Sequence, residues 1–266
     1  MAKNKDASAG HPVRRAGFGP AVAGEVRNST VASGRLDAAD LTVDRAVALA
    51  LTPVSRETTE RLDRFVAFLL ERNHITNLIA VSTVPKVWTR HVADSLQLLP
   101  LGDGETWTDF GSGGGFPGMI IACAFAERPG STIHLIESRE KKADFLRAAV
   151  ELLDVPAIVH TGRIEEIANQ LPAIDTVTAR ALAPLPQLLA YIQPLVQKGA
   201  KGLLMKGQDV EAELTQASKY WKIQAKLVPS KTDPTGHIMI VSNLVRTNAT
   251  DRKKPRDVRP ARRTNF

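Results

Sequence analysis

The stretch Thr108-Asp109-Phe110-Gly111-Ser112-Gly113-Gly114-Gly115-Phe116-Pro117-Gly118 decides the fold of this 266-residue chain. A short run with strand character, residues 105–110, leads into it, and an apolar run with helix character, residues 119–126, follows it. Because glycine has no Cβ and adopts positive φ readily, a glycine-rich turn between a strand and a helix lets a ligand lie against bare backbone. The helix should add unpaired N–H groups at its start, with Pro117 at the first helical position, where a missing N–H costs nothing. The stretch therefore predicts a site for a nucleotide-like ligand.

The glycine spacing fits two kinds of nucleotide site. Gly113, Gly115 and Gly118 give G-x-G-x-x-G, the fingerprint of dinucleotide-binding folds. Asp109, followed by alternating glycines from Gly111 to Gly115, gives D-x-G-x-G-x-G, the pattern of motif I in S-adenosylmethionine-dependent methyltransferases. An acid two residues before the first glycine is typical of the methyltransferase motif, so we favour it. An NAD-dependent Rossmann oxidoreductase remains the alternative.

Either kind of site needs an acid that holds a ribose at the end of the second strand. The run of residues 132–137, Thr-Ile-His-Leu-Ile-Glu, has strand character and ends at Glu137. Its distance from the glycine run is about 20 residues, as the dinucleotide fingerprint requires and the methyltransferase motif allows. Glu137 is therefore the expected ribose ligand, although it does not separate the two alternatives.

Composition places the chain among ordinary globular proteins. Hydrophobic residues make up 43% of it, which is enough for one sizeable core. The single cysteine excludes a disulfide framework and a multi-cysteine metal site, and we predict no bound metal. No apolar run approaches the length of a membrane span, and no early stretch has the apolar core of a signal peptide. We therefore expect a soluble, cytoplasmic protein with no membrane partner.

The net charge of +7 is unevenly distributed along the chain. Residues 1–36 carry +4 and residues 246–266 carry +6, which leaves residues 37–245 near −3. Both ends are rich in Gly, Pro, Ser, Asn and Arg and lack apolar periodicity, so we predict disordered basic tails at residues 1–38 and 246–266. Two roles fit such a tail: a solubilising appendage, or an arm that binds nucleic acid through counterion release.

Periodicity divides the rest of the chain into a helical cap and an alternating domain. Residues 39–100 are expected to form the N-terminal cap, because apolar residues recur at helical spacing near 57–72 and again near 84–99. Beyond the cap, strands and helices alternate, which favours a parallel sheet with right-handed crossovers. The expected strands are residues 105–110, 132–137, 157–160, 175–180, 202–206, 221–228 and 237–245, with no helix between the last two.

A dinucleotide dehydrogenase would normally continue into a second half of the same fold. We therefore predict an α/β fold over residues 39–245, that of a class I S-adenosylmethionine-dependent methyltransferase. This fold is Rossmann-like, with a mostly parallel seven-stranded sheet and a C-terminal antiparallel hairpin.

Several short motifs follow one another in a defined order. They are Asn77-Leu78, Arg90-His91-Val92-Ala93-Asp94-Ser95, Asp109 to Gly118, Gly162-Arg163-Ile164-Glu165-Glu166, Ala179-Arg180-Ala181 and Lys206-Gly207. With them, over about residues 55–245, the chain resembles the bacterial small-subunit ribosomal RNA guanine-N7 methyltransferase family, also called the glucose-inhibited division protein B family. The resemblance implies S-adenosylmethionine as methyl donor and N7 of one guanine in 16S ribosomal RNA as acceptor. The implied partner is 16S ribosomal RNA or the small ribosomal subunit, and we expect a monomer.

The sequence departs from the family at one position of the glycine-rich loop. The third position of this loop, often proline in the family, is Gly114 here, and we expect this departure to affect only the stiffness of the loop.

The resemblance also implies roles at the cofactor site. Gly111 corresponds to the point where the family's loop backbone meets the cofactor, and Phe116 to an apolar neighbour of the cofactor. Glu137 corresponds to the ribose position, and Ile164 and Glu165 to the pair that flanks the adenine. The full set of expected cofactor-binding residues is Asp109, Gly111, Gly113, Gly115, Phe116, Glu137, Ile164, Glu165 and Arg180.

The chemistry that the resemblance implies needs few catalytic groups. Guanine N7 carries a lone pair and no proton, so its attack on a sulfonium methyl group needs no general base. Rate then comes mainly from alignment and desolvation. An oxidoreductase or hydrolase would need a proton-transfer group or a nucleophile, and we find no Ser-His-Asp or Cys-His pattern. We therefore assign no catalytic residue.

Substrate positioning is the role to assign instead. The candidates are Arg90, His91, Arg180 and Lys206. Arg180 and Lys206 each end a strand at the carboxyl edge of the sheet, where open α/β sheets bind ligands. A buried structural role is an equal alternative for His91. A non-catalytic RNA-binding module on the same fold is a further alternative for the whole protein.

Overall fold

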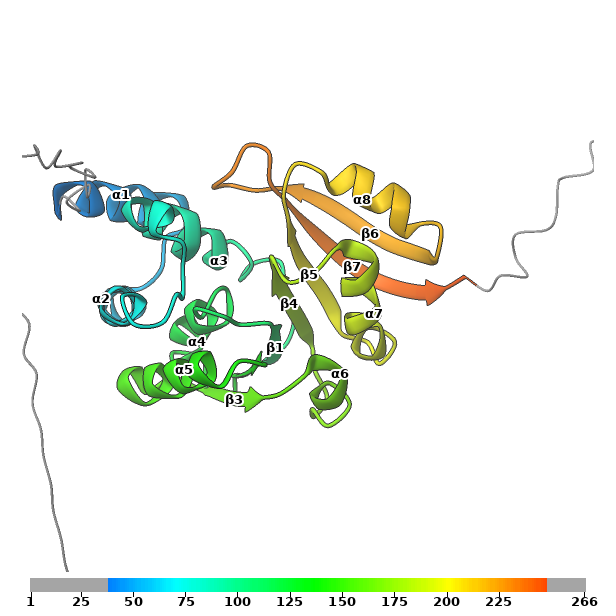
Figure 1. Cartoon of the computed structure of the whole chain (residues 1–266), viewed down its shortest axis with the longest axis horizontal. Coiled ribbons are helices and arrows are strands. Elements are labelled where there is room, and N and C mark those ends of the chain that lie inside the picture. The colour runs from blue at the N-terminus through cyan, green and yellow to red at the C-terminus, as the bar shows by residue number, and fades with distance from the viewer. Residues whose placement is uncertain (1–37, 248–266) are drawn as a thin grey trace, which may run out of the picture. The chain divides into compact units, whose positions relative to one another are not determined.

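The computed structural model describes residues 38–247 (Figure 1). Its elements follow in the order α1 (Ala38–Leu51), α2 (Arg56–Asn73), η1 (Val81–Lys86), η2 (Trp88–Ala93), α3 (Asp94–Leu96), β1 (Thr106–Phe110), α4 (Gly118–Phe125), β2 (Thr132–Glu137), α5 (Glu140–Leu153), β3 (Ala157–Thr161), α6 (Ile164–Ile167), β4 (Thr176–Arg180), α7 (Leu185–Val196), β5 (Lys201–Lys206), α8 (Val210–Ala217), β6 (Trp221–Pro229) and β7 (His237–Arg246). Each strand begins and ends within one residue of its predicted position.

Both predicted tail boundaries fall one residue too far into the folded part. Ala38 begins α1 and Arg246 ends β7, so each residue belongs to a regular element. The remainder of the two predicted tails lies outside the described residues. Within residues 38–247, no helix is long and apolar enough to cross a membrane.

The sheet contains seven strands in the order β3-β2-β1-β4-β5-β7-β6. β1 to β5 run parallel, and β7 lies antiparallel between β5 and β6. This arrangement confirms the predicted α/β architecture with its closing hairpin. The chain moves from β1 outward to β3 on one side and returns to β4 on the other side of β1. The carboxyl ends of β1 and β4 therefore form a topological switch point, where sheets of this kind bind their ligands.

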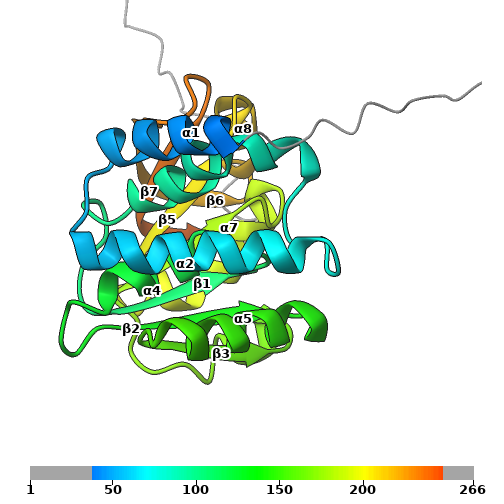
Figure 2. The ribbon, with the colours of Figure 1, turned by 90° about the vertical axis from the view of Figure 1, so that its left-hand side faces the viewer.

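Side chains alternate across the sheet and build two cores. In β2, Ile133 and Leu135 pack in a core with Phe65 of α2, whereas Ile136 packs in a second core with Leu188 of α7. Helices α2, α4 and α5 lie on the first face and α6, α7 and α8 on the second (Figure 1). Figure 2 looks onto the first face, with α2 and α5 in front of the strands. With both faces covered, the functional residues gather at the carboxyl edge.

The predicted helix over residues 84–99 is helical only as far as Leu96, and it consists of three short elements of different helix type. η1 is a 3-10 helix that contains Pro85, which has no backbone N–H to donate, and η2 is a π-helix. Asp44 of α1 binds the N–H groups at the break: its carboxylate accepts from the N–H of Trp88 at 2.8 Å and from the hydroxyl of Thr89 at 2.6 Å. Single π-helical turns often occur at functional sites, and residues of η2 line the large cavity described below.

Candidate active site

The loop between β1 and α4 has a backbone shape that its glycines permit. Gly111, Gly113 and Gly115 have φ values of 72°, 55° and 94°, a region that residues with a side chain rarely adopt. A Cβ on Gly111 would lie 2.6 Å from Cδ1 of Leu182, a residue of the loop after β4. The loop therefore offers bare backbone at this point, as the sequence predicts.

Gly114 has a tighter role than the sequence suggests. A Cβ at this position would lie 2.8 Å from the carbonyl oxygen of Leu78. The segment that contains Leu78 is itself fixed by Asn73, whose Oδ1 accepts hydrogen bonds of 2.9 Å from the N–H groups of Leu78 and Ile79. Glycine at position 114 thus lets this segment pack directly against the loop, which is a steric requirement and not only a matter of stiffness.

Asp109 holds the loop from inside. Its side chain is fully buried, and its carboxylate accepts hydrogen bonds from the Gly118 N–H at 3.1 Å and from Thr178 Oγ1 at 2.8 Å. Burial raises the pKa of Asp109 to about 6, against the opposing effect of the hydrogen bond from Thr178. The N–H of Met119 is also bonded within the loop, and Pro117 precedes α4 as its cap residue. The expectation of unpaired N–H groups at the start of this helix is therefore wrong.

Glu137 ties the end of β2 to the loop after β1. Its Oε2 accepts from the N–H of Gly113 at 2.9 Å, and its Oε1 accepts from the N–H of Arg139 at 2.8 Å. The residue is only 6% exposed. Each carboxylate oxygen has a second lone pair, so these contacts leave acceptor capacity for the hydroxyl groups of a ribose.

Two cavities meet at Gly111. The small cavity, of about 260 Å³, lies between the loops after β3 and β4, and its walls include Ile164, Glu165 and Leu182. The large cavity, of about 550 Å³, lies beside the carboxyl ends of β4 and β5 and extends to η2 and the β6–β7 loop. The backbone of Gly111 lines both. An elongated ligand can therefore lie across the glycine with one end in each cavity.

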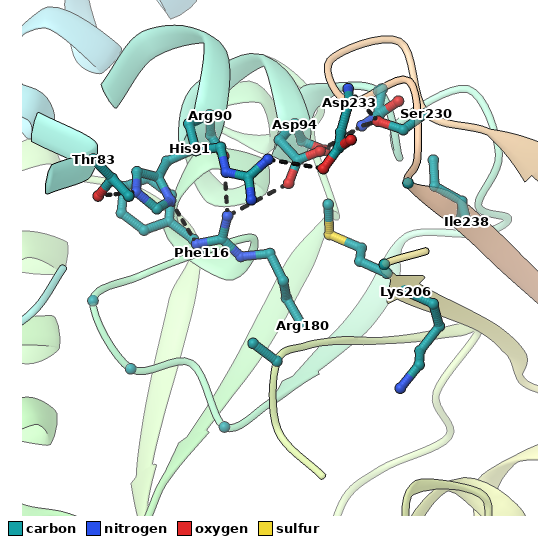
Figure 3. Close-up of a pocket in the computed structure, with 18 of the residues that line it drawn as sticks. Thr83, Arg90, His91, Asp94, Phe116, Arg180, Lys206, Ser230, Asp233 and Ile238 are labelled. Atoms are coloured by element: carbon teal, nitrogen blue, oxygen red, sulfur yellow. Dashed lines mark hydrogen bonds and ion pairs between the residues drawn. The ribbon is translucent and has the colours of Figure 1, made fainter. Parts of the chain in front are cut away.

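Arg180, the last residue of β4, is held at the wall of the large cavity by four contacts (Figure 3). Its Nη1 donates to the carbonyl oxygen of Arg90 at 3.2 Å and lies 3.4 Å from Oδ2 of Asp94. Its Nη2 lies 2.8 Å from Nδ1 of His91. The guanidinium carbon also lies 5.2 Å from the centre of the Phe116 ring. Burial lowers the pKa of Arg180, while the charge of Asp94 acts to raise it.

His91 is buried behind Arg180 and is neutral. Its ring stacks on Phe116 with a centroid distance of 4.8 Å, and its Nε2 lies 2.9 Å from Oγ1 of Thr83. Burial, followed by the positive charges of Arg180 and Arg90, lowers the pKa of His91 to about 3. Both ring nitrogens are engaged by the protein, so the predicted direct contact between His91 and the substrate does not match this geometry.

The β6–β7 loop closes the large cavity against α3 and η2. Asp94 accepts a hydrogen bond of 2.6 Å from Oγ1 of Thr232, and Gln97 Oε1 accepts one of 2.8 Å from the N–H of residue 231. Arg90 forms an ion pair of 2.9 Å with Asp233 (Figure 3). Hydrogen bonds from Thr235, together with Arg90, lower the pKa of Asp233 to about 2. Asp94 therefore holds both Arg180 and the loop.

Two lysines line the large cavity, Lys142 of α5 and Lys206 of β5. Contrary to expectation, Lys206 does not face the Arg180 cluster: its Nζ lies 2.7 Å from Oε2 of Glu213 in α8, and its side chain points away from that cluster (Figure 3). Lys142 is therefore the better placed of the two to meet an anionic substrate.

Comparisons with known proteins identify the family of this chain. The profile of the family described as "GidB: rRNA small subunit methyltransferase G" matches residues 58–239. This chain belongs to that family. Among its relatives is "Ribosomal RNA small subunit methyltransferase G" of Bradyrhizobium sp. strain BTAi1, which is 56% identical over 78% of this chain and 95% of its own length. A protein of the same name from Nitrobacter hamburgensis is 53% identical over 79% of this chain and 82% of its own.

Solved structures confirm the fold. An O-methyltransferase from Bacillus cereus in complex with SAH superposes with a TM-score of 0.51 and 18% identity, over 76% of this chain and 98% of that one. At this identity the likeness concerns architecture alone. It places the present member of the methyltransferase G family on the fold of S-adenosylmethionine-dependent methyltransferases, as the sequence predicts.

In this family member, most of the predicted site residues surround the two cavities. The large cavity is lined by Gly111, Gly113, Phe116, Arg90, His91, Arg180 and Lys206. The small cavity is lined by Gly111, Ile164 and Glu165. Asp109, Gly115 and Glu137 line neither, and they support the loop from behind. Sequence reasoning missed the contributions of Thr83 and Asp233, for which no motif gave a signal.

Proposed function

We propose that this protein transfers a methyl group from S-adenosylmethionine to N7 of a guanine in 16S ribosomal RNA. The observation that carries the proposal is the family match over residues 58–239, together with relatives named ribosomal RNA small subunit methyltransferase G that are more than half identical. The pair of cavities that share Gly111 supports it. The same inference assigns the small ribosomal subunit or its RNA as partner, a monomeric state and a cytoplasmic location.

The residues present fit S-adenosylmethionine. We assign its adenosine end to the small cavity, where Ile164 supplies an apolar wall and Glu165 a polar rim. The ribose then lies near Glu137, whose carboxylate retains free lone pairs. The methionine end crosses Gly111, where no Cβ obstructs it, into the large cavity. When bound, the cofactor supplies a sulfonium methyl carbon for attack by the base lone pair, and the C–S bonding pair leaves on sulfur.

The side chains around the large cavity suit a reaction without proton transfer. His91 is neutral and has both nitrogens engaged, and Lys206 is paired with Glu213. None of these groups is free to act as a general base, and N7 of guanine has no proton to remove. The chain contributes alignment, through the loop and the Arg180 cluster, and exclusion of water by the β6–β7 loop.

Two positive side chains at the large cavity, besides Arg180, suit an RNA substrate. Arg90 of η2 and Lys142 of α5 line it from different elements. Cationic groups of this kind bind phosphates without regard to sequence and so position the RNA. The described part of the chain holds no group of three or more His, Cys, Asp or Glu residues that would suit a metal ion.

The deciding experiment is methylation of RNA with labelled S-adenosylmethionine. Purified protein is incubated with 16S ribosomal RNA or small ribosomal subunits, and the labelled position is mapped. We expect one 7-methylguanine per RNA. Binding of RNA with no incorporation of label would favour the non-catalytic module, and calorimetry that showed tight NAD binding with no response to S-adenosylmethionine would favour an oxidoreductase.

A further inference from the structure

The hydrogen bonds around His91 determine its tautomer. Thr83 Oγ1 donates its single proton to the carbonyl oxygen of Ala80 at 2.7 Å. It must therefore accept at its second contact, so the 2.9 Å contact with His91 requires an Nε2–H on the ring. A neutral imidazole with Nε2–H carries a lone pair on Nδ1, which faces Nη2 of Arg180 at 2.8 Å. His91 is thus an acceptor aimed at the guanidinium.

Three acceptors leave part of the guanidinium unused. A guanidinium has five N–H donors. The contacts to the carbonyl of Arg90, to Asp94 and to His91 occupy both protons of Nη1 and one of Nη2. The Nε–H and the second Nη2 proton have no partner within residues 38–247. Arg180 lines the large cavity, so these donors are available to a substrate there.

The charge around Arg180 favours a neutral acceptor. Asp94 already lies 3.4 Å from the guanidinium, and Asp233 lies on the same cavity wall. These two negative groups would repel an incoming carboxylate, whereas they would repel a carbonyl oxygen much less, because it carries no net charge. On a guanine, the carbonyl O6 adjoins N7, and arginine recognises this edge of the base. An adenine presents an amino group at the same place.

We propose that His91, held as the Nε2–H tautomer by Thr83, is a positioning residue that aims Arg180 at the O6 oxygen of the guanine to be methylated. This rests on the proposed function. Arg180 is then the residue that distinguishes guanine from adenine, and His91 acts only through it. The Phe116 ring contacts both groups: it stacks on the His91 ring, and its centre lies 5.2 Å from the guanidinium carbon of Arg180.

A matched pair of variants tests the acceptor at Nδ1. His91→Asn keeps a polar atom at the δ position of the side chain, whereas His91→Gln moves it to the ε position, and both lose the imidazole stack on Phe116. We expect His91→Gln to lose about tenfold to a hundredfold in kcat/KM for RNA, the effect of one hydrogen bond to a charged group. His91→Asn should lose clearly less than His91→Gln, because it keeps an acceptor near the position of Nδ1, and the KM for S-adenosylmethionine should stay unchanged in both. Equal losses in the two variants, or a matching rise in the KM for S-adenosylmethionine, would overturn the proposal.

A thermodynamic cycle tests the O6 contact itself. RNA that carries 2-aminopurine at the mapped position keeps N7 but lacks O6. The wild-type protein should methylate it about tenfold to a hundredfold more slowly than guanine, while Arg180→Met should show little preference between the two bases. A wild-type enzyme that does not discriminate, or an Arg180→Met variant that discriminates equally well, would refute the contact.

Nitrogen-15 NMR of histidine-labelled protein supplies a readout that does not depend on activity. The His91 signals are assigned by their disappearance in His91→Asn. At neutral pH we expect a protonated Nε2 and an unprotonated Nδ1, and the opposite tautomer or a doubly protonated ring would refute the assignment. If the wild-type protein methylates no RNA, the proposed function fails. If it does methylate RNA but these tests fail, only the role of His91 is lost.

Discussion

Glu137 Oε2 accepts a hydrogen bond of 2.9 Å from the main-chain N–H of Gly113, which joins the end of β2 to the loop after β1. The second oxygen of the same carboxylate binds the N–H of Arg139. One acidic residue therefore shapes both loops that border the cofactor site. The acid that the sequence assigns to the ribose also has a structural role, and a test has to separate the two.

Replacement of Glu137 by alanine separates these roles. Glu137→Ala removes the acceptor of two part-buried hydrogen bonds, so we expect about 0.5–1.5 kcal/mol less stability for each bond in denaturant unfolding. Loss of the ribose contact should also weaken S-adenosylmethionine binding by about 1.5–3 kcal/mol in calorimetry. Glu166→Ala, at an exposed acid on α6, is the control and should change neither. A folded Glu137→Ala variant with wild-type affinity would reject the ribose assignment.

Alanine at Gly111 should block the passage between the two cavities. Its new Cβ would lie 2.6 Å from Leu182 at a residue with φ of 72°. Gly199→Ala is a matched control, because Gly199 also has positive φ but a Cβ there meets nothing within 4 Å. Both variants should lose roughly 1–2 kcal/mol of stability from backbone strain. Only Gly111→Ala should lose more than about tenfold in cofactor affinity, or about 1.4 kcal/mol, because its Cβ must displace Leu182, which lines the small cavity. Equal affinities in the two variants would show that the loop has been misinterpreted.

The sheet was predictable because its central strands β1, β2, β4 and β5 are mostly buried, and because strands and helices alternate along the chain. A continuous apolar run such as Gly202 to Met205 is typical of a strand that is covered on both faces. The glycine loop was predictable too, because positive φ leaves few other residues for Gly111, Gly113 and Gly115. These features depend on local sequence alone.

The rest depends on partners that are distant in the chain. The break in the predicted helix 84–99 requires Asp44, more than forty residues earlier, to bind the N–H groups of Trp88 and Thr89. Glu213 draws Lys206 away from the large cavity. Neither Asp44 nor Glu213 belongs to a recognisable sequence motif, so only the tertiary contacts show what each of them does.

Asp109 should make stability depend on pH. Burial raises its pKa in the folded protein to about 6 from the ordinary value of 3.8. Its contribution to stability is therefore fully present below pH 4 and is lost as the pH rises through 6. At about 1.4 kcal/mol per pKa unit, the loss is about 3 kcal/mol. We expect the unfolding free energy of the wild-type protein to fall relative to that of Asp109→Asn between pH 4 and pH 7.5. A constant difference would show that the carboxyl is not perturbed.

Arg180→Lys should keep the positive charge and lose most of the activity. A lysine ammonium cannot reproduce a planar fork that meets His91 and Asp94 and stacks on Phe116. We expect kcat/KM for RNA to fall by at least about tenfold, the effect of one hydrogen bond to a charged group. Arg147→Lys is the matched control, since Arg147 pairs with exposed acids on α5 and such pairs contribute about 0–1 kcal/mol. Wild-type kinetics in Arg180→Lys would show that only the charge matters.

Asp233→Asn should strengthen RNA binding. Asp233 forms an ion pair with Arg90, whose side chain is 55% exposed and lines the large cavity. An RNA phosphate that binds Arg90 must therefore compete with the carboxylate of Asp233. Without the charge of Asp233, Arg90 is free to bind phosphate, and the slope of log affinity against log salt should steepen by about 0.9. Asp63→Asn removes the acid that pairs with Arg45, at residues that do not line the large cavity, and should leave the slope unchanged. Salt titrations of 16S ribosomal RNA binding measure both variants. A weaker affinity for Asp233→Asn, with an unchanged slope, would mean that the ion pair serves to hold the β6–β7 loop and that Arg90 meets no phosphate.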